Sequence, residues 1–303
     1  LRADKPADGH QLLDHRSAVE TQGAQVIRDF LGFLRKHRPA QVGVVLILLV
    51  VFAAVLAPVL TDYGPKDPVS YNFFEDPSSS HWLGLDGQGY DLFSRIVYGA
   101  RTTLRIALLA TLLAMCLGGV MGSLAGYAGR WIDLTVMRVV DFMMSFPSFL
   151  LAVVMVAILG KSLDNLVLAV GIVGAPLFAR QVRAEVLRVK ALEYVESARA
   201  LGYSNLRILL CHVLPNCLTP LIVLATLGMG SAILDVAGLA FLGLGGDPFD
   251  PEWGLILKAG WNSPSKGAFQ VGVAGACILG TVLGFNLLGD GLRDWLDPRT
   301  RLK

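Results

Sequence analysis

Charged residues are scarce in this 303-residue chain, and their scarcity identifies its class. Only 17% of the residues are charged, 54% are hydrophobic, and the mean hydropathy is +0.57. A soluble domain of this length carries more charge and fewer apolar residues. The apolar residues also gather in blocks of about 20, the length that crosses the hydrocarbon core of a bilayer. The composition predicts a polytopic membrane protein, and the net charge of +2 is too small to indicate a nucleic-acid partner.

Residues that bind metals, form disulfides or perform catalysis are also few. The 4 cysteines have no CxxC spacing and lie in or beside apolar blocks, which favours buried free thiols. The 5 histidines are scattered without HExxH or another metal-ligand spacing, and no GxSxG occurs. We therefore expect no metal site, no bound cofactor and no catalytic residue in this chain.

A phosphate-binding loop is missing as well. Gly160-Lys161-Ser162 resembles the end of one, but Met155 stands where the motif needs its first glycine. Ion-coupled transporters place ionisable residues near the bilayer midplane, whereas the middles of these apolar blocks are almost entirely apolar. Asp235 follows Pro215 by about 30 Å along a helix, which places it near the outer face. Energy for any transport would then come from a partner.

Six membrane spans are predicted from the apolar blocks, at about 42–60, 104–127, 139–159, 163–184, 218–239 and 269–288. Residues 1–39 are polar and end in a basic cluster, which indicates a tail followed by an amphipathic helix on the membrane surface. The predicted organisation is a first transmembrane helix, an outer loop, a core of five further spans, and a C-terminal tail, over residues 40–61, 62–98, 99–291 and 292–303.

Basic residues fall on one side of the membrane if the chain has six spans. They occupy both tails, the loop between the second and third spans, and the insert between the fourth and fifth. The two longest loops on the other side are acidic. Lysine and arginine mark the cytoplasmic loops of multi-pass proteins. The pattern therefore predicts that both termini lie in the cytoplasm.

Small residues recur four positions apart in the second and sixth spans. Such ridges let helix backbones approach closely in lipid. They comprise Gly118, Gly122 and Gly126, and Gly272, Ala276, Gly280 and Gly284. Two interpretations stay open, namely packing within the chain and contact with a second membrane subunit.

The polar insert from Glu193 to Asn216 is the most distinctive segment of the chain. Charged pairs three residues apart predict a helix over 180–202, with Gly202 as its C-cap and a second short helix over 205–212. Apolar residues at this bend would form an exposed patch: Ala198, Ala200, Leu201, Tyr203, Leu206 and Ile208. Such a patch would dock on another protein or lie on lipid headgroups.

The same residues resemble the EAA loop of bacterial ABC importer permeases. In that loop a glutamate and two small residues precede a glycine, and a Leu-Pro follows, which here are Glu196, Ser197, Ala198, Gly202, Leu214 and Pro215. Ser197 and His212 depart from the usual alanine and isoleucine. Further segments, over 81–104, 138–152, 240–257 and 288–301, resemble the dipeptide, oligopeptide and nickel permease group of the "C" subunit type.

The resemblance implies an all-α fold of the type I ABC importer permease, in a bacterial plasma membrane. It implies a second homologous permease, two cytoplasmic ATPases that use ATP and Mg²⁺, and an extracytoplasmic binding protein that delivers a peptide. The loop over about 185–216 would couple the chain to an ATPase through Glu193, Glu196, Ser197, Ala198, Arg199, Ala200, Gly202, Leu214 and Pro215.

Other residues are weaker candidates, and other functions stay open. Asp235 would face the pathway or pair structurally, and it stands where the group usually has glutamate. The outer loops would dock the binding protein or form an interfacial aromatic belt, with Trp82, Asp86, Asp91 and Trp253 as candidates. A nickel or other small-solute importer is the alternative substrate class, and an ion-coupled secondary transporter or a scaffold without transport is the alternative kind of protein.

Overall fold

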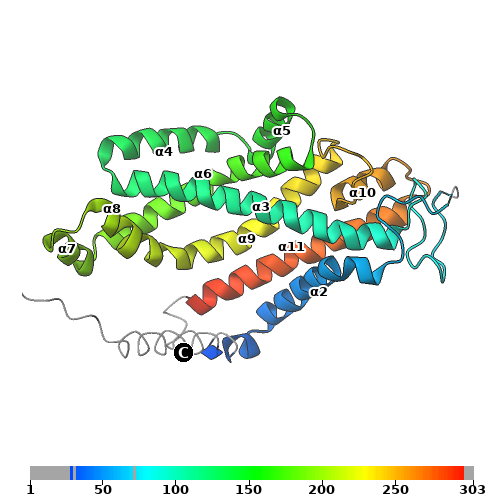
Figure 1. Ribbon diagram of the computed structural model, residues 1–303, viewed down its shortest axis with the longest axis horizontal. Helices are drawn as coiled ribbons and strands as arrows, with labels where there is room; N and C mark the ends of the chain where they lie inside the picture. The colour runs from blue at the N-terminus through cyan, green and yellow to red at the C-terminus, as the bar shows by residue number, and fades with distance from the viewer. Residues whose placement is uncertain (1–27, 30–31, 71–72, 297–303) are drawn as a thin grey trace, which may run out of the picture.

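The long apolar segments form a bundle of helices that runs between two polar ends (Figure 1). The computed structural model describes residues 28–29, 32–70 and 73–296. Its helices are α2 (Arg38–Leu60), α3 (Leu92–Tyr127), α4 (Arg130–Met144), α5 (Ser148–Leu159), α6 (Leu163–Lys190), α7 (Glu193–Ala200), α8 (Asn205–Ile208), α9 (Leu214–Phe241), α10 (Trp253–Trp261) and α11 (Ala268–Leu296). A π-helical turn, Leu209–Val213, joins α8 to α9.

Within the described ranges, five helices are long and apolar enough to cross a membrane, or six if the bent pair α4–α5 counts as one span. This agrees with the predicted all-α, multi-span class. Of the predicted N-terminal tail, residues 32–36 are helical and residues 1–27 lie outside the described part. Helix α11 continues to Leu296, so the predicted boundary of the C-terminal tail at 292 falls inside a helix.

The prediction of the second span was wrong about where the helix begins. Helix α3 starts at Leu92, capped by the Asp91 carboxylate, which accepts the backbone N–H of Ser94 at 3.1 Å. Its 36 residues make a helix roughly 54 Å long, far more than the hydrocarbon core requires. Hydropathy alone missed the first turns because they carry arginines, of which Arg95 is buried against protein whereas Arg101 and Arg105 are exposed.

The predicted third span, 139–159, is not one continuous helix. Helix α4 ends at Met144, α5 starts at Ser148, and the two are bent by 93°. Pro147 stands directly before α5, and proline disfavours helical geometry at the residue that precedes it. At about 18 Å, the 12-residue α5 is too short to cross a bilayer alone.

The predicted helix over 180–202 is also interrupted, because α6 runs to Lys190 and α7 begins only at Glu193. In the opposite sense, the short helix predicted over 205–212 is not separate. It continues through the π-helical turn into α9, so one bent rod extends from Asn205 to Phe241. The fifth span therefore starts well before the predicted Leu218.

Glycines decide how the bundle packs. The ridge of α3 lies directly on α6, where a Cβ added at Gly118 would stand 2.5 Å from the carbonyl oxygen of Ala175. A Cβ at Gly122 would stand at the same distance from the carbonyl oxygen of Ala179. Packing within the chain is therefore the role of this ridge, as one of the two interpretations proposed.

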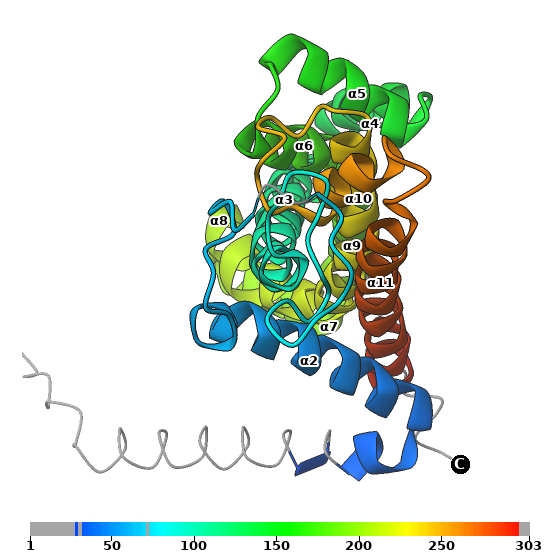
Figure 2. The same cartoon turned by 90° about the vertical axis from the view of Figure 1, so that its right-hand side faces the viewer.

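The ridge of α11 divides into two parts. Gly284 packs on α2, where a Cβ added at Gly43 would lie 2.8 Å from the Gly284 carbonyl oxygen. Gly272 and Gly280 have no such neighbour within 4 Å. Helix α2 thus lies against α11 (Figure 2), while the outer half of the α11 ridge is open in the single chain.

Adjacent glycines of α3 offer a matched test of the α3–α6 contact. We expect Gly118→Ala to lower the free energy of unfolding by about 1–3 kcal/mol, because the added methyl group would overlap backbone atoms of α6. Gly119→Ala should be neutral or slightly stabilising, since nothing lies within 4 Å of its Cβ position and alanine favours helix. Thermal unfolding of the purified protein in detergent measures both. Equal stability of the two variants would contradict the close α3–α6 contact.

Candidate coupling corner and outer cavity

The corner between α7 and α8 forms the end of the molecule opposite the 62–91 loops and α10 (Figure 1). Gly202 makes the turn possible with a φ of +81°, a value that residues with a side chain adopt rarely. Its N–H donates to the Arg199 carbonyl at 3.0 Å, and the Tyr203 N–H donates to the Ala198 carbonyl at 3.2 Å. These two bonds form a Schellman motif, which confirms Gly202 as the predicted C-cap.

Two residues of α7 anchor the corner from inside. Val195 and Ala198 are buried and pack in one cluster with Ile208 and Val213. Ala198 and Ile208 therefore do not belong to the exposed patch that the sequence predicted. Helical spacing turns Val195 and Ala198 inward together, because residues three apart share a helix face.

The outer surface of the same corner carries the remaining predicted residues. Leu201 is 75% exposed and Leu206 is 66% exposed, and Tyr203 lies beside them under the Arg207 guanidinium at 4.5 Å. The other exposed members are Glu193, Glu196, Ser197, Arg199, Ala200 and Gly202. The result is a projecting apolar edge among charges.

The π-helical turn connects this corner to α9. Pro215 lacks an N–H and its ring would clash with the carbonyl four residues earlier, so a regular α-helix cannot pass through it unchanged. The His212 carbonyl instead accepts from the Asn216 Nδ2 at 2.7 Å and from the Tyr194 hydroxyl at 3.2 Å. Tyr194 belongs to α7, so these bonds tie the coupling corner directly to the start of the fifth span. Leu214 is half-buried next to Pro215.

At the other end of the molecule, Arg95 holds the two outer loops together. Its guanidinium is fully buried and donates to the Asp86 carboxylate at 2.7 Å and to the Asp250 carbonyl at 3.2 Å. Asp86 also accepts the N–H groups of Gln88 and Tyr90. Breaking such a buried pair leaves an uncompensated charge, which costs about 3–5 kcal/mol. Sequence reasoning missed Arg95 because it assigned this residue to a loop.

A second buried group lies where α10 begins. Glu252 accepts from the Leu255 N–H at 3.0 Å and from the Thr103 hydroxyl at 3.2 Å. The Trp253 indole donates to the Ile96 carbonyl at 2.9 Å. Burial raises the pKa of Glu252 from 4.5 to about 7. The hydrogen bonds that Glu252 accepts act in the opposite direction and lower its pKa, but burial has the larger effect. Glu252 and Trp253 therefore lock α10 onto α3.

The predicted docking residues separate into two groups. Trp82 is 66% exposed, and its ring packs at a tilt on Phe93 with the ring centroids 5.0 Å apart. Asp86, Asp91 and Trp253 are at most 4% exposed and are engaged in the internal contacts above. Their side chains are not offered to a partner in this structure, because the loops fold back on α3.

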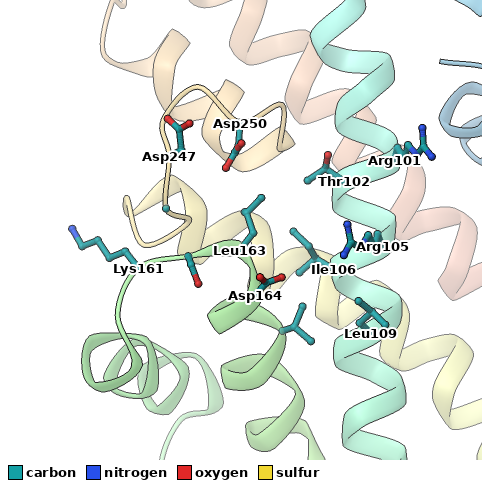
Figure 3. A pocket seen from close by; sticks show the side chains of 13 residues that line it. Arg101, Thr102, Arg105, Ile106, Leu109, Lys161, Leu163, Asp164, Asp247 and Asp250 are labelled. Carbon is teal, nitrogen blue, oxygen red and sulfur yellow. The ribbon is translucent and has the colours of Figure 1, made fainter. Parts of the chain in front are cut away.

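A cavity of about 580 Å³ opens between α3, the start of α6 and the loop before α10. Figure 3 shows Arg105 on the α3 wall and Asp164 on the α6 wall, with Ile106 between them. Lys66 reaches across from the first outer loop and contacts Asp247 at 2.8 Å and Asp250 at 2.7 Å. The hydrogen bonds to these two carboxylates raise the pKa of Lys66.

Asp235 lines a smaller cavity of about 130 Å³ between α3, α6 and α9. Thr111, whose buried hydroxyl has no hydrogen-bond partner in the described part of the chain, lines the same cavity. Among the described residues no group of three or more His, Cys, Asp or Glu is placed to hold a metal ion.

Glu252 generates a prediction about pH. Between pH 4.5 and 7 the native carboxyl keeps a proton that the unfolded chain releases, so the native state loses stability as pH rises through 7. We expect Glu252→Gln to remove about 3 kcal/mol of this pH dependence from the unfolding free energy. Thermal unfolding at pH 5, 6, 7 and 8 compares the two proteins. Identical pH slopes would show that Glu252 is not a buried proton site.

Comparison with known proteins agrees with this architecture. The family described as "Binding-protein-dependent transport system inner membrane component" matches residues 118–302. Residues 26–77 match the "N-terminal TM domain of oligopeptide transport permease C". A dipeptide transport system permease protein, DppC, of Alkalihalophilus pseudofirmus is 44% identical over 90% of this chain and 90% of its own length.

A glutathione transport system permease protein, GsiD, of Pectobacterium atrosepticum is 41% identical over 89% of each chain. In fold, the chain is similar to the MetNI methionine ABC transporter in inward-facing conformations. That likeness has a TM-score of 0.55 at 21% identity and covers 67% of this chain and 97% of the other.

The family match covers more than half of the chain, and the relatives align over nine-tenths of it. The relatives are permease subunits rather than enzymes, and ATP hydrolysis belongs to separate subunits. The chain therefore belongs to the binding-protein-dependent transport system inner membrane component family, and is a multi-pass inner-membrane permease subunit of an ABC importer.

Proposed function

We propose that this chain forms one half of the translocation pathway of a peptide importer, and that a second, homologous permease forms the other half. The similarity to a dipeptide permease along nine-tenths of both chains is the observation that carries the substrate class. The relative named for glutathione, itself a small peptide, supports the same class. The open outer part of the α11 ridge and the exposed apolar faces of α4 and α5 leave room for a membrane partner and for lipid.

We propose further that the α7–α8 corner seats in one of two cytoplasmic ATPases, which use ATP and Mg²⁺ while this chain binds neither. Leu201 and Leu206 supply the apolar edge, and Glu193, Glu196 and Arg199 supply charged contacts around it. Ser197, Ala200 and Gly202 are small and permit close approach. Ala198, Leu214 and Pro215 act from inside, by holding the corner in register with α9.

This assignment places the α7–α8 end of the bundle, and with it both termini, in the cytoplasm. Movement of the ATPases would then be transmitted along α6 and α9 as rigid bodies and would open the outer side. Asp235 lines the small cavity between α3, α6 and α9, which supports its place beside the pathway.

At the outer end, we propose that an extracytoplasmic binding protein contacts the 62–91 loops. Trp82 is the candidate for direct contact because most of its surface is exposed. Asp86, Asp91 and Trp253 would act indirectly, by keeping the loops in the shape that the binding protein meets.

Uptake measurements test the substrate class and the energy source together. Cells that lack this chain should regain uptake of a labelled dipeptide when the chain is restored, and should take up no additional Ni²⁺. Uptake should stop when the partner ATPase is inactivated and should survive collapse of the proton gradient while ATP persists. Restoration of nickel uptake alone, or sensitivity to the proton gradient with ATP present, would refute the proposal.

Two substitutions at Gly202 test the coupling corner. We expect Gly202→Asn to keep most of its transport activity, because asparagine tolerates a φ of +81°. Gly202→Val should lose most transport and substrate-stimulated ATP hydrolysis while the protein still reaches the membrane, because a β-branched residue strains this conformation. The position itself is open, with nothing within 4 Å of its Cβ site.

The pair of outcomes is informative. Loss of activity in both variants would indicate that the ATPase approaches Gly202 too closely for any side chain. Normal transport by the valine variant would contradict the coupling role of the corner. Ala198→Asp is a less selective test, because Ala198 is buried and a charge there unfolds the corner itself.

A further inference from the structure

Four charged side chains that line the outer cavity have no partner within the described part of the chain, and two of them, the exposed Arg105 and Asp164, carry opposite charges. Among the residues that the structure describes, neither the Arg105 side chain nor the Asp164 side chain makes an ion pair or hydrogen bond. The other two acids of the cavity differ, since Asp247 and Asp250 are both held by Lys66. Lys66, which lies beside the cavity, is therefore also engaged.

The remaining basic side chains that line the cavity point elsewhere. In Figure 3 the side chains of Arg101 and Lys161 extend away from the space between the walls, whereas Arg105 and Asp164 lie on either side of Ile106. Arg105 belongs to α3, and Asp164 belongs to the first turn of α6. The two charges come from separate helices that pack closely, so their separation is fixed by the bundle.

The cavity has the size and lining of a site for a small solute. Its volume of about 580 Å³ lies within the ~300–1,000 Å³ that is usual for ligand pockets. Its apolar lining includes Ile106, Leu109, Leu163 and Val167, which can receive aliphatic or aromatic side chains. Of the unpaired charges in the lining, Arg105 and Asp164 are the two that lie on either side of Ile106 (Figure 3), and together with the apolar lining they suit a zwitterion that carries hydrophobic groups.

We propose that Arg105 and Asp164 form a receiving site at the outer end of the pathway for the two free ends of a short peptide. Arg105 binds the terminal carboxylate through a charge-assisted pair, and Asp164 binds the terminal ammonium. The ends of an extended dipeptide are at most roughly 7 Å apart, which is the span that the two side chains would have to bracket. This proposal rests on the proposed peptide function and assigns the binding of the two peptide ends to Arg105 and Asp164.

The test combines a change in the protein with a change in the peptide. The assembled importer, with its binding protein at saturating concentration, is reconstituted in liposomes, and uptake of dialanine is compared with that of its C-terminal amide. We expect Arg105→Gln to slow dialanine uptake about tenfold and to slow uptake of the amide less than twofold, because the amide lacks the charge that Arg105 reads. Dividing the slowing of dialanine uptake by the slowing of amide uptake removes any preference of the binding protein for one peptide over the other.

The other end of the peptide gives the mirror experiment. Asp164→Asn should slow uptake of dialanine about tenfold but that of N-acetyl-dialanine less than twofold. Arg101→Gln is the matched control, one helical turn away on α3 with its guanidinium turned from the cavity, and should leave both rates unchanged. Equal slowing of blocked and free peptides would overturn the proposal, and would indicate that the charges bind lipid phosphate or support the fold.

If the wild-type importer does not transport blocked peptides, the proposal can be tested by exchanging the two charged residues. Arg105→Asp and Asp164→Arg should each abolish uptake, and the double variant should recover at least half of it, because a zwitterion can bind in the reverse direction. The two side chains make no ion pair with each other in the structure, so recovery of uptake favours a ligand between them over a direct ion pair. Absence of recovery would overturn the proposal. Failure of the wild-type importer to move any peptide would instead refute the proposed function.

Discussion

The close contact between α3 and α6 is the constraint on which the rest of the molecule depends. Two glycines of α3 let its backbone lie on the carbonyl oxygens of α6, which no larger residue permits at these positions. In lipid, burying apolar surface between helices gives little free energy because the lipid tails are themselves apolar. Close packing of this kind therefore drives helix association. Both the outer cavity and the cluster beneath the coupling corner are built on this pair of helices.

Helices α6 and α9 extend from the α7–α8 corner to the end of the molecule that carries the cavity. Helix α6 begins at the outer cavity with Asp164 and ends at Lys190, just before the coupling corner. Helix α9 begins at the π-helical turn, which Tyr194 of α7 contacts, and ends before the loop that carries Asp247. Two continuous helices therefore connect the α7–α8 corner with the opposite end of the bundle. The broken α4–α5 segment is not such a rod, because it bends by 93°.

The sequence predicted the helical class, the apolar membrane segments and the turn at Gly202 because these depend on local or composition-level signals. Hydropathy identifies apolar segments of membrane length. Gly202 indicates the end of α7 because glycine readily adopts the positive φ that this turn requires. The misses have an equally physical origin. Polar first turns of α3 look like a loop when burial is unknown, and Pro147 breaks a segment whose average hydropathy is uniformly high.

Composition and pattern alone determined that the chain is a membrane protein, that it has no phosphate-binding loop, and that its polar insert turns at Gly202. Only the tertiary structure decided which polar residues are free to act. Asp86 and Asp91 look as available as Asp164 in the sequence, yet the fold buries the first two and leaves the third unpaired across a cavity from Arg105. The difference arises because pairing depends on distances between helices far apart in the chain, and those distances are set by packing rather than by sequence position.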